Sequence, residues 1–313
     1  MTCPADADRL WLEPSRIEAA CNVRENAGYH HAAQTTRAFG KLMLDELDSL
    51  GGEDGLVRAL TRVVGLPLEA FPRAVPPVEI RRVRKSKTPG DDLARHDVID
   101  REDIGGAHAV RDIVVPGLLR RALSLHVASI LTETSDHLLP EEGIAYRPHS
   151  RRVVQAAILD VARQVRSGFE YWAKLDIKSF FPSVPWRGLH RALRRFGYSE
   201  DFTRRVMALV RTPILAKMSW ASWVPVENIS GAQAGLPESS VLANIFLSDL
   251  DQRVVALGLD MQKQKRSHTR LLDYRRYSDD LLILGRTKEA VRRAVVEIDS
   301  WVSKQGMTIK EAP

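Results

Sequence analysis

Residues up to about Leu66 carry their hydrophobic side chains at helical spacing. This spacing is clear in TTRAFGKLMLDELDSL and ends near the proline-bearing stretch GLPLEAFPRAVPP. Two strands are then expected, in VEIRRVR and AVRDIVVP, separated by a polar loop that contains glycine. Helical spacing returns in GLLRRALSLHVASILTE and from Val153 to Arg166.

The second half alternates between strands and helices. YWAKLD predicts a strand that stops at Asp176, and helices follow from about Trp186 to Arg211, around a break at Gly197. Another helix is expected from about Ser240 to Leu257, and two paired strands flank Asp279.

The end of the chain completes a recognisable order of elements. Thr287 is expected to cap a helix that ends at Gly306, and MTI to form one more strand. Apart from the inserted helices after Asp176, the order is strand, helix, two strands, helix, strand. This is the order of a ferredoxin-like split βαβ unit, so the expected fold class is α+β.

Composition narrows the possibilities. The 313 residues, 44% of them hydrophobic, are enough for a large core and for two or more subdomains. Lys and Arg number 46 against 40 Asp and Glu, which permits a polyanionic partner without requiring one. Cys3 and Cys21 alone exclude a disulfide framework and a cysteine metal site. With no bilayer-spanning apolar run and no signal-peptide pattern, the expected location is the cytoplasm.

Asp279 and Asp280 are unexpected in a run that otherwise reads as buried strand. In one interpretation they form a solvated hairpin turn between a strand from Leu271 to Tyr277 and another from Leu281 to Leu284. In the other they have a partner elsewhere in the sheet. The first strand of a split βαβ sheet lies beside the hairpin strands, so Asp176 is expected to lie against this turn.

Three clustered carboxylates repel one another unless a cation lies between them. Ligands that are all oxygen suit Mg²⁺, which keeps positions for water and substrate phosphates. Two such ions can clamp the attacking and leaving oxygens of a phosphoryl displacement. The chemistry indicated is nucleotidyl transfer.

Five sequence motifs resemble those of one enzyme family. YRRYSDDLLIL is similar to the Tyr-x-Asp-Asp motif of reverse transcriptases, and LDIKSFFPSV to the preceding palm motif of group II intron, retron and related bacterial enzymes. GAQAGLPESSVLANIFLSDLD resembles the motif between them, and VRDIVVPGLLRRAL and EEGIAYRPHSRR resemble two motifs of the fingers side. The motifs occur in the family's order over about Val110 to Ile309, so the chain is identified as a bacterial reverse transcriptase.

The resemblance implies a right-hand polymerase of fingers and palm, with the palm built on the ferredoxin-like sheet. It places an N-terminal helical region at 1–75, fingers at 76–170, and a palm at 171–313 with a helical insertion at about 186–211. The helical thumb of the family is expected to be missing from this chain or supplied by a partner.

The resemblance also implies the site. Asp176, Asp279 and Asp280 would be catalytic, and the same three would bind metal together with Ile177. Asp176 and Asp279 would hold two Mg²⁺ ions, with Mn²⁺ as the alternative, and Asp280 would support them. The residues expected against the incoming dNTP are Ile177, Phe181, Arg111, Pro237 and Glu238.

Phe181 matches the family's steric gate, a ring that excludes a ribose 2′-hydroxyl. If the chain is extended there, Phe180 and Phe181 face opposite ways, so that one lies in the core and the other forms the gate. The alternative is that both lie in the core. Arg111 would contact the triphosphate, since a guanidinium fork suits phosphate oxygens, unless it is a solvated strand residue.

Glu238 and Ser239 stand where the family usually has Gln-Gly. A glutamate there repels phosphate unless it pairs with an arginine or turns away, and it could instead read a base edge. Arg147 and a basic cluster are nucleic-acid or triphosphate contacts or else solvated residues; the cluster comprises Arg81, Arg82, Arg84, Lys85 and Lys87.

The expected partners are an RNA template or a bound noncoding RNA, the DNA product, dNTPs and a possible protein partner, with no membrane. The family resemblance and the divergent LPESS favour an RNA-directed DNA polymerase of antiphage defence, in the group related to abortive infection. A group II intron-type or retron enzyme is the alternative. A catalytically weak nucleic-acid-binding scaffold with the polymerase fold is another.

Overall fold

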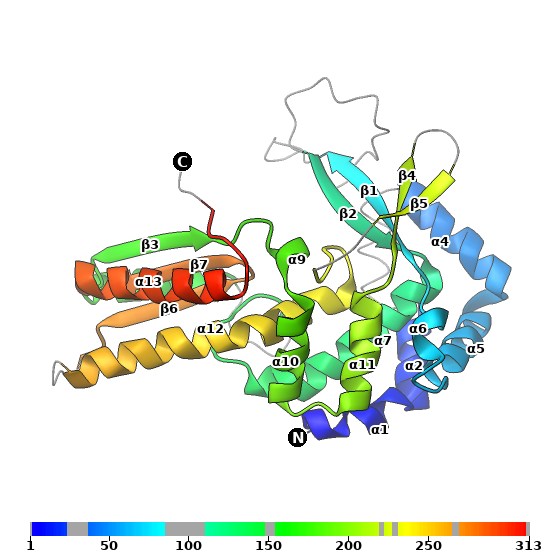
Figure 1. Cartoon of the computed structure of the whole chain (residues 1–313), viewed down its shortest axis with the longest axis horizontal. Coiled ribbons are helices and arrows are strands. Elements are labelled where there is room, and N and C mark those ends of the chain that lie inside the picture. The colour runs from blue at the N-terminus through cyan, green and yellow to red at the C-terminus, as the bar shows by residue number, and fades with distance from the viewer. Residues whose placement is uncertain are drawn as a thin grey trace. The chain divides into compact units, whose positions relative to one another are not determined.

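The structure is a computed structural model that describes residues 2–23, 37–84, 110–147, 154–218, 222–226, 231–264 and 269–310. The chain divides into two units. Unit 1 consists of Met1–Thr134, Tyr198–Ile229 and Gln233–Ser239, and unit 2 of Ser135–Gly197, Ser230–Ala232 and Ser240–Pro313. Figure 1 labels their elements.

Unit 1 is mainly helical, as the spacing of its hydrophobic residues predicts. Its described helices are η1 (Pro4–Asp6), α1 (Ala7–Trp11), α2 (Pro14–Cys21), α4 (Arg37–Leu50), α5 (Gly52–Val64), α6 (Phe71–Ala74), α7 (Leu118–Ser135, of which Ser135 belongs to unit 2) and α11 (Glu200–Val210). The Trp11 ring lies at the centre of their core. It meets Phe71, His126 and Phe202 edge-on, with ring centroids 5.4, 5.4 and 6.0 Å away.

A four-stranded sheet in unit 1 has the order β2-β1-β4-β5. Its strands are β1 (Val78–Arg84), β2 (Val110–Pro116), β4 (Ile214–Met218) and β5 (Ser222–Val226). The first two confirm the strands expected from VEIRRVR and AVRDIVVP. The β4–β5 hairpin was not predicted, because Pro225 argues against a strand; β5 is the outermost strand, where proline is tolerated. The polar loop predicted between β1 and β2 lies outside the described residues.

Unit 2 contains a three-stranded antiparallel sheet of order β3-β7-β6, built from β3 (Tyr171–Asp176), β6 (Leu272–Tyr277) and β7 (Asp280–Gly285). Strand β7 lies between the two strands that the split βαβ unit connects, as predicted. The last expected strand is wrong in extent. It is reduced to one bridge, Ile177 to Ile309, because the chain after Gly306 crosses only the end of β3.

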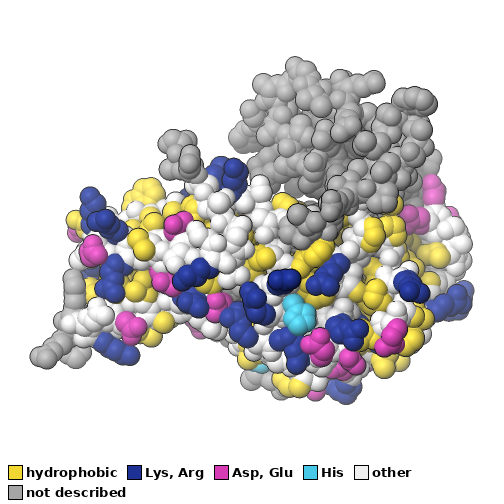
Figure 2. All heavy atoms as spheres, viewed as in Figure 1, with side chains coloured by type: hydrophobic (Ala, Val, Ile, Leu, Met, Phe, Trp, Pro, Cys, Tyr) yellow, Lys and Arg dark blue, Asp and Glu magenta, His cyan; other side chains and the backbone are white. Residues whose placement is uncertain are grey.

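Five further helices are described for unit 2: α8 (Val154–Arg166), α9 (Phe180–Ser183), α10 (Trp186–Phe196), α12 (Pro237–Gln264, whose first three residues belong to unit 1) and α13 (Lys288–Lys304), besides the short η2 (Asp136–Leu138). Thr287 caps α13 as predicted, since its hydroxyl accepts a hydrogen bond from the Ala290 amide. Basic side chains lie over α10 (dark blue in Figure 2). No described helix is long and apolar enough to cross a membrane.

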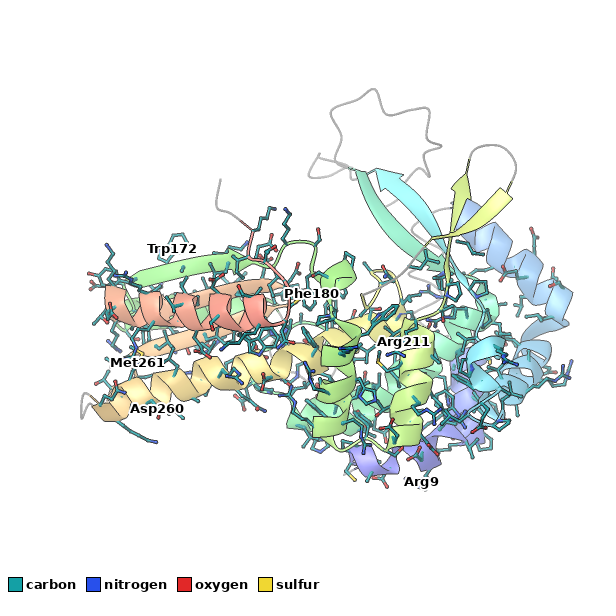
Figure 3. The ribbon with its side chains drawn as sticks, viewed as in Figure 1. Arg9, Trp172, Phe180, Arg211, Asp260 and Met261 are labelled. Carbon is teal, nitrogen blue, oxygen red and sulfur yellow. The ribbon has the colours of Figure 1, made fainter. Side chains whose placement is uncertain are left out.

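The two faces of the unit 2 sheet differ in character. On the helix face, Leu281 and Ile283 are fully buried, and the position of a β-carbon on Gly285 is 2.6 Å from Val291 of α13. The opposite face, here called the carboxylate face, carries Asp176 and Asp280, because residues directly paired across antiparallel strands point the same way. Trp172 of β3 also lies on this face and is 69% exposed (Figure 3).

Candidate functional site

The three predicted carboxylates meet at one end of the unit 2 sheet. Asp176, the last residue of β3, is directly paired with Asp280, the first residue of β7. Asp279 lies in the two-residue turn that joins β6 to β7, next to Ser278 with its φ of 58°. Each interpretation therefore holds in part: Asp279 lies in a hairpin turn, Asp280 already belongs to β7, and Asp176 lies beside both.

Two lysines neutralise two of these carboxylates. The Lys174 ammonium is 3.0 Å from Asp280 Oδ1, and the Lys310 ammonium is 3.5 Å from Asp176 Oδ2. The hydrogen bond to Asp280 raises the pKa of Lys174. All four side chains are largely exposed to solvent, so these pairs are weak and exchangeable.

Asp279 forms no ion pair with any described residue. Its pKa is raised, first by the loss of hydration on burial and then by the charges of Asp176 and Asp280. A cation close to all three carboxylates would reverse that effect.

The donor set has the chemistry of a hard-cation site but not its assembled geometry. Carboxylate oxygens are the ligands that Mg²⁺ prefers. Ile177 has a buried hydrocarbon side chain, so only its main-chain carbonyl could act as a ligand. Across the residues that the structure describes, no group of three or more His, Cys, Asp or Glu side chains is arranged to hold a metal. Two of the three carboxylates are instead paired with Lys174 and Lys310.

A buried ionic cluster supports the turn from the helix face. Arg276 of β6 donates to both carboxylate oxygens of Asp251 on α12, at 2.8 and 2.7 Å. It also donates to the Asn244 amide oxygen at 3.0 Å and to the Ser278 carbonyl at 3.1 Å, while the Tyr274 hydroxyl donates to Asp251 at 3.0 Å. Arg276 thereby fixes the backbone of the turn that carries Asp279.

A loop before α8 completes this arrangement. The Ile144 amide donates to the Arg276 carbonyl at 3.0 Å, and the Arg276 amide to the Glu142 carbonyl at 2.9 Å. Gly143 must lack a side chain, since a β-carbon there would be 2.5 Å from a guanidinium nitrogen of Arg276. Sequence reasoning missed this cluster. The only local signal was an arginine inside a run that reads as buried strand.

Phe180 and Phe181 lie in the short helix α9, so the extended geometry under which the two rings would face opposite ways does not apply here. The Phe181 carbonyl accepts a bond from Ala232 at 2.9 Å, which holds the segment curled. Phe180 is buried as expected, whereas Phe181 is only half-buried. Their rings meet edge-on, 5.3 Å apart.

The LPESS segment contains a buried ion pair within unit 1. Glu238 is 1% exposed, and its Oε1 is 2.8 Å from an Arg120 guanidinium nitrogen. Arg120 also donates to the Leu209 carbonyl at 3.2 Å and to the Ser124 hydroxyl. Of the possibilities raised by the sequence, pairing with an arginine is the one that the structure shows. Pro237, the first residue of α12, is half-buried.

The other basic candidates divide into two groups. Arg147 donates four hydrogen bonds to Asp136, Pro140 and Gly143, at 2.7 to 3.1 Å, which gives it a structural role in its own loop. Arg111 lies on β2, paired with Val83, and its side chain lies outside the described part. The same holds for the side chains of Arg81, Arg82 and Arg84 on β1, and for Lys85 and Lys87 altogether.

The chain is similar in sequence to one curated protein and in structure to several solved ones. The chain is 24% identical to the retron Ec73 reverse transcriptase of Escherichia coli over 156 residues, which are 49% of this chain and 43% of that protein. The chain thus spans less than half the length of this relative. Its structure is similar to a truncated apo telomerase from Candida tropicalis (TM-score 0.46, 13% identity, 60% of this chain and 39% of that one). It is also similar to the RNA-dependent RNA polymerase of bacteriophage phi12 (TM-score 0.47, 12% identity, 85% and 46%).

The family itself is identified from more than half of the chain. Residues 103–312 match the model of the reverse transcriptase (RNA-dependent DNA polymerase) family, a range that includes all three carboxylates at the hairpin turn. The chain has a mixed α/β fold with a small antiparallel sheet, and it belongs to the reverse transcriptase family.

Proposed function

We propose that the chain is an RNA-directed DNA polymerase that extends a primer with dNTPs on an RNA template. The observation that carries this proposal is the convergence of Asp176, Asp279 and Asp280 at one end of the sheet in a member of the reverse transcriptase family. In this proposal 76–170 are the fingers, 171–313 the palm with the inserted helices of 186–211, and 1–75 an N-terminal helical region.

Asp176, Asp279 and Asp280, with the carbonyl of Ile177, would hold two Mg²⁺ ions. When bound, Mg²⁺ supplies charge stabilisation on the reacting phosphates and lowers the pKa of the primer hydroxyl. Before that, Lys174 and Lys310 pair with two of the carboxylates, and Asp279 is the one that forms no ion pair with a described residue and whose pKa is raised, mainly by burial. Arg276 and Asp251 hold the turn in place without touching the substrate.

Phe181 would select deoxyribose in this proposal, because its half-buried ring can lie against the sugar while Phe180 anchors α9 in the core. Phe181→Ala should raise the use of rNTPs relative to dNTPs in primer extension. Phe180→Ala should instead cost about 3 to 5 kcal/mol of unfolding free energy. If a folded, active Phe181→Ala protein discriminated between rNTPs and dNTPs as wild type does, Phe181 would not be the steric gate.

The test of the activity is incorporation of labelled dNTPs on a primed RNA template, with Mg²⁺, with Mn²⁺ and with a chelator. The polymerase proposal expects template-dependent extension with either metal and none with the chelator. A protein that binds the primed template and never extends it would instead be the scaffold alternative.

The cellular role that we propose is bacterial antiphage defence, on the strength of the divergent LPESS segment. The similarity to a retron reverse transcriptase favours the retron-type alternative. Sequencing the nucleic acid that copurifies with the protein separates the two, because a retron enzyme should carry its own structured RNA and the DNA copied from it.

A further inference from the structure

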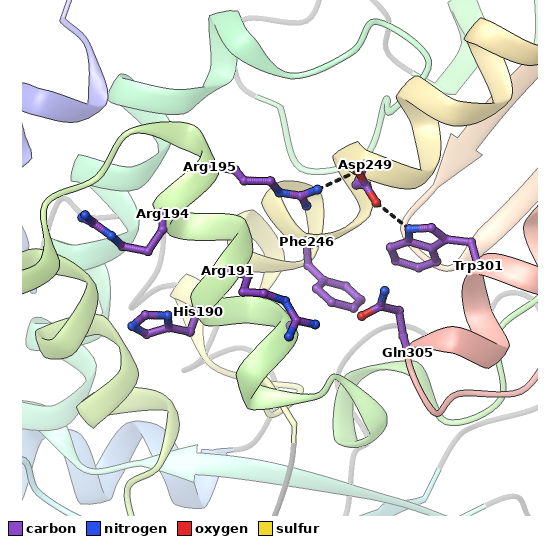
Figure 4. Close-up of a pocket in the computed structure, with 9 residues that line it drawn as sticks. His190, Arg191, Arg194, Arg195, Phe246, Asp249, Trp301 and Gln305 are labelled. Atoms are coloured by element: carbon purple, nitrogen blue, oxygen red, sulfur yellow. Dashed lines mark hydrogen bonds and ion pairs between the residues drawn. The ribbon is translucent and has the colours of Figure 1, made fainter.

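A basic pocket lies on the helix face of unit 2, between α10, α12 and α13. Its volume is about 520 Å³, and Figure 4 shows most of its lining residues. Trp301 and Gln305 contribute from the α13 side and Phe246 and Asp249 from α12. Because α13 covers the face of the sheet opposite to Asp176 and Asp280, the pocket is separate from the carboxylates.

Helix α10 contributes an uninterrupted positive charge to this pocket. Its sequence, WRGLHRALRRF, contains four arginines, one histidine and no acid. Arginines at i and i+4 repel each other, and a solvated helix face usually intersperses acids that relieve the repulsion. A helix that lacks them is suited to an external polyanion.

The one carboxylate in the pocket is already neutralised. Asp249 accepts from Arg195 at 2.6 Å, from Arg253 at 3.2 Å and from the Trp301 indole at 2.7 Å. Asp249 therefore anchors the pocket wall and leaves the positive charge of α10 in excess.

Arg187 and Arg191 form no ion pair with any described residue, and both are exposed. In Figure 4 the Arg191 guanidinium extends towards Phe246 and Gln305. Gly188 lets α10 lie close to the same two side chains, since a β-carbon there would lie 2.9 Å from the Phe246 ring and 3.1 Å from the Gln305 side-chain oxygen. Arg187 to Arg195 span about 12 Å along the helix axis, enough for several phosphates of one strand.

We infer that α10 and its pocket bind the sugar-phosphate backbone of an RNA strand, outside the site of nucleotide addition. The occupant is RNA because the inference rests on the proposed function, in which the chain acts on an RNA template. Guanidinium groups supply bidentate contacts to phosphate oxygens, and contacts of this kind position a strand without reading its sequence.

The test compares two double variants with equal loss of charge in binding to a single-stranded RNA of about 30 nucleotides. Arg187→Gln/Arg191→Gln should weaken binding and reduce the slope of log K against log salt by about 1.4, two phosphate contacts at roughly 0.7 each. Arg163→Gln/Arg166→Gln, on the exposed end of α8, should leave the slope unchanged. Arg187→Lys/Arg191→Lys should keep the wild-type slope.

The inference would be overturned if both glutamine variants lost the same amount of RNA affinity and salt slope, or if neither lost any. It would also be overturned by competition by polyglutamate as effective as that by RNA, or by stronger binding of a DNA strand of the same sequence. Asp279→Asn, measured in parallel, should keep the wild-type salt slope while it loses nucleotide addition. A failure of the proposed polymerase function would therefore leave this test intact.

Discussion

Two sets of charged side chains lie on opposite faces of the same hairpin. On the carboxylate face, Asp176 and Asp280 are paired with exposed lysines, and Asp279 forms no ion pair within the described residues. On the helix face, Arg276 and Asp251 are buried and satisfy one another with two hydrogen bonds.

The two faces thus differ in exposure: the exposed charges can exchange partners, and the buried charges cannot. An exposed ion pair contributes little to the free energy of folding, and its carboxylate can readily exchange the lysine for another cation. A buried pair costs several kcal/mol when one partner is removed, because the other charge stays behind without water. One hairpin thus carries both a replaceable and a permanent set of partners.

The largest expected effect is on catalysis. Asp279→Asn and Asp176→Asn should each reduce nucleotide incorporation by more than about 100-fold, beyond the usual effect of changing a group that only orients a ligand. Primer extension at saturating dNTP measures this. Asp260→Asn, an exposed carboxylate on α12, is the matched control and should extend normally. Full activity of either site variant would remove the carboxylate face from the mechanism.

The second effect is on stability and tests the buried pair of Arg276 and Asp251. Arg276→Met should lower the free energy of unfolding by about 3 to 5 kcal/mol, because Asp251 is left buried without its partner. Denaturant unfolding measures the loss, with the exposed Arg292→Met as control. Arg276→Met/Asp251→Leu should recover much of it. A loss below 1 kcal/mol in the single variant would mean that the cluster behaves like a surface pair.

The third effect concerns the buried pair of unit 1. Glu238→Gln keeps one hydrogen bond to Arg120 and loses the charge, so the expected cost is smaller, about 1 to 3 kcal/mol. Arg120 Nε and Glu238 Oε2 have no hydrogen-bond partner, unlike the fully paired Arg276, which makes this pair the less complete one. The affinities of the four dNTPs should stay in the same ratio. A change in that ratio would mean that Glu238 reaches the nucleotide.

The smallest effect is a dependence of stability on pH. The pKa of Asp279 is raised above the ordinary 3.8, so its ionisation in the folded protein opposes folding. Asp279→Asn should therefore melt at a higher temperature than wild type at pH 7. The difference should shrink as the pH falls through the raised pKa and vanish below 3.8, where both forms are uncharged. A melting difference that is the same at pH 3 and pH 7 would exclude the ionisation of Asp279 as its cause.

Local sequence patterns were sufficient to predict the β6–β7 hairpin and most of the helices. Strand β3 ends at Asp176, α13 begins after Thr287, and the break between α10 and α11 falls at Gly197, which has a φ of 98°. Each of these features depends on residues within one turn of it. The order of strands also followed, since a split βαβ unit permits few arrangements.

Pairings between distant residues were not predictable. Arg120 meets Glu238 across 118 positions of sequence, and Arg276 meets Asp251 across 25. Nothing local distinguishes these arginines from the exposed ones of α10. Which charge is buried depends on tertiary packing. Sequence reasoning therefore predicted that the three carboxylates come together and missed the buried Arg276 and Asp251 that support their turn.

The two edges of the unit 2 sheet will behave differently when copies of the protein meet at high concentration. The outer edge of β6 is paired at Arg276, whose amide and carbonyl bond to the loop at Gly143. Along β3 the described chain pairs only at the end, through Lys310 and Asp176, and leaves Trp172 exposed. Such an edge invites strand addition, and Lys174 is the charge in its middle that discourages it. We therefore expect the same lysine that pairs with Asp280 to limit association of copies of the protein through this edge.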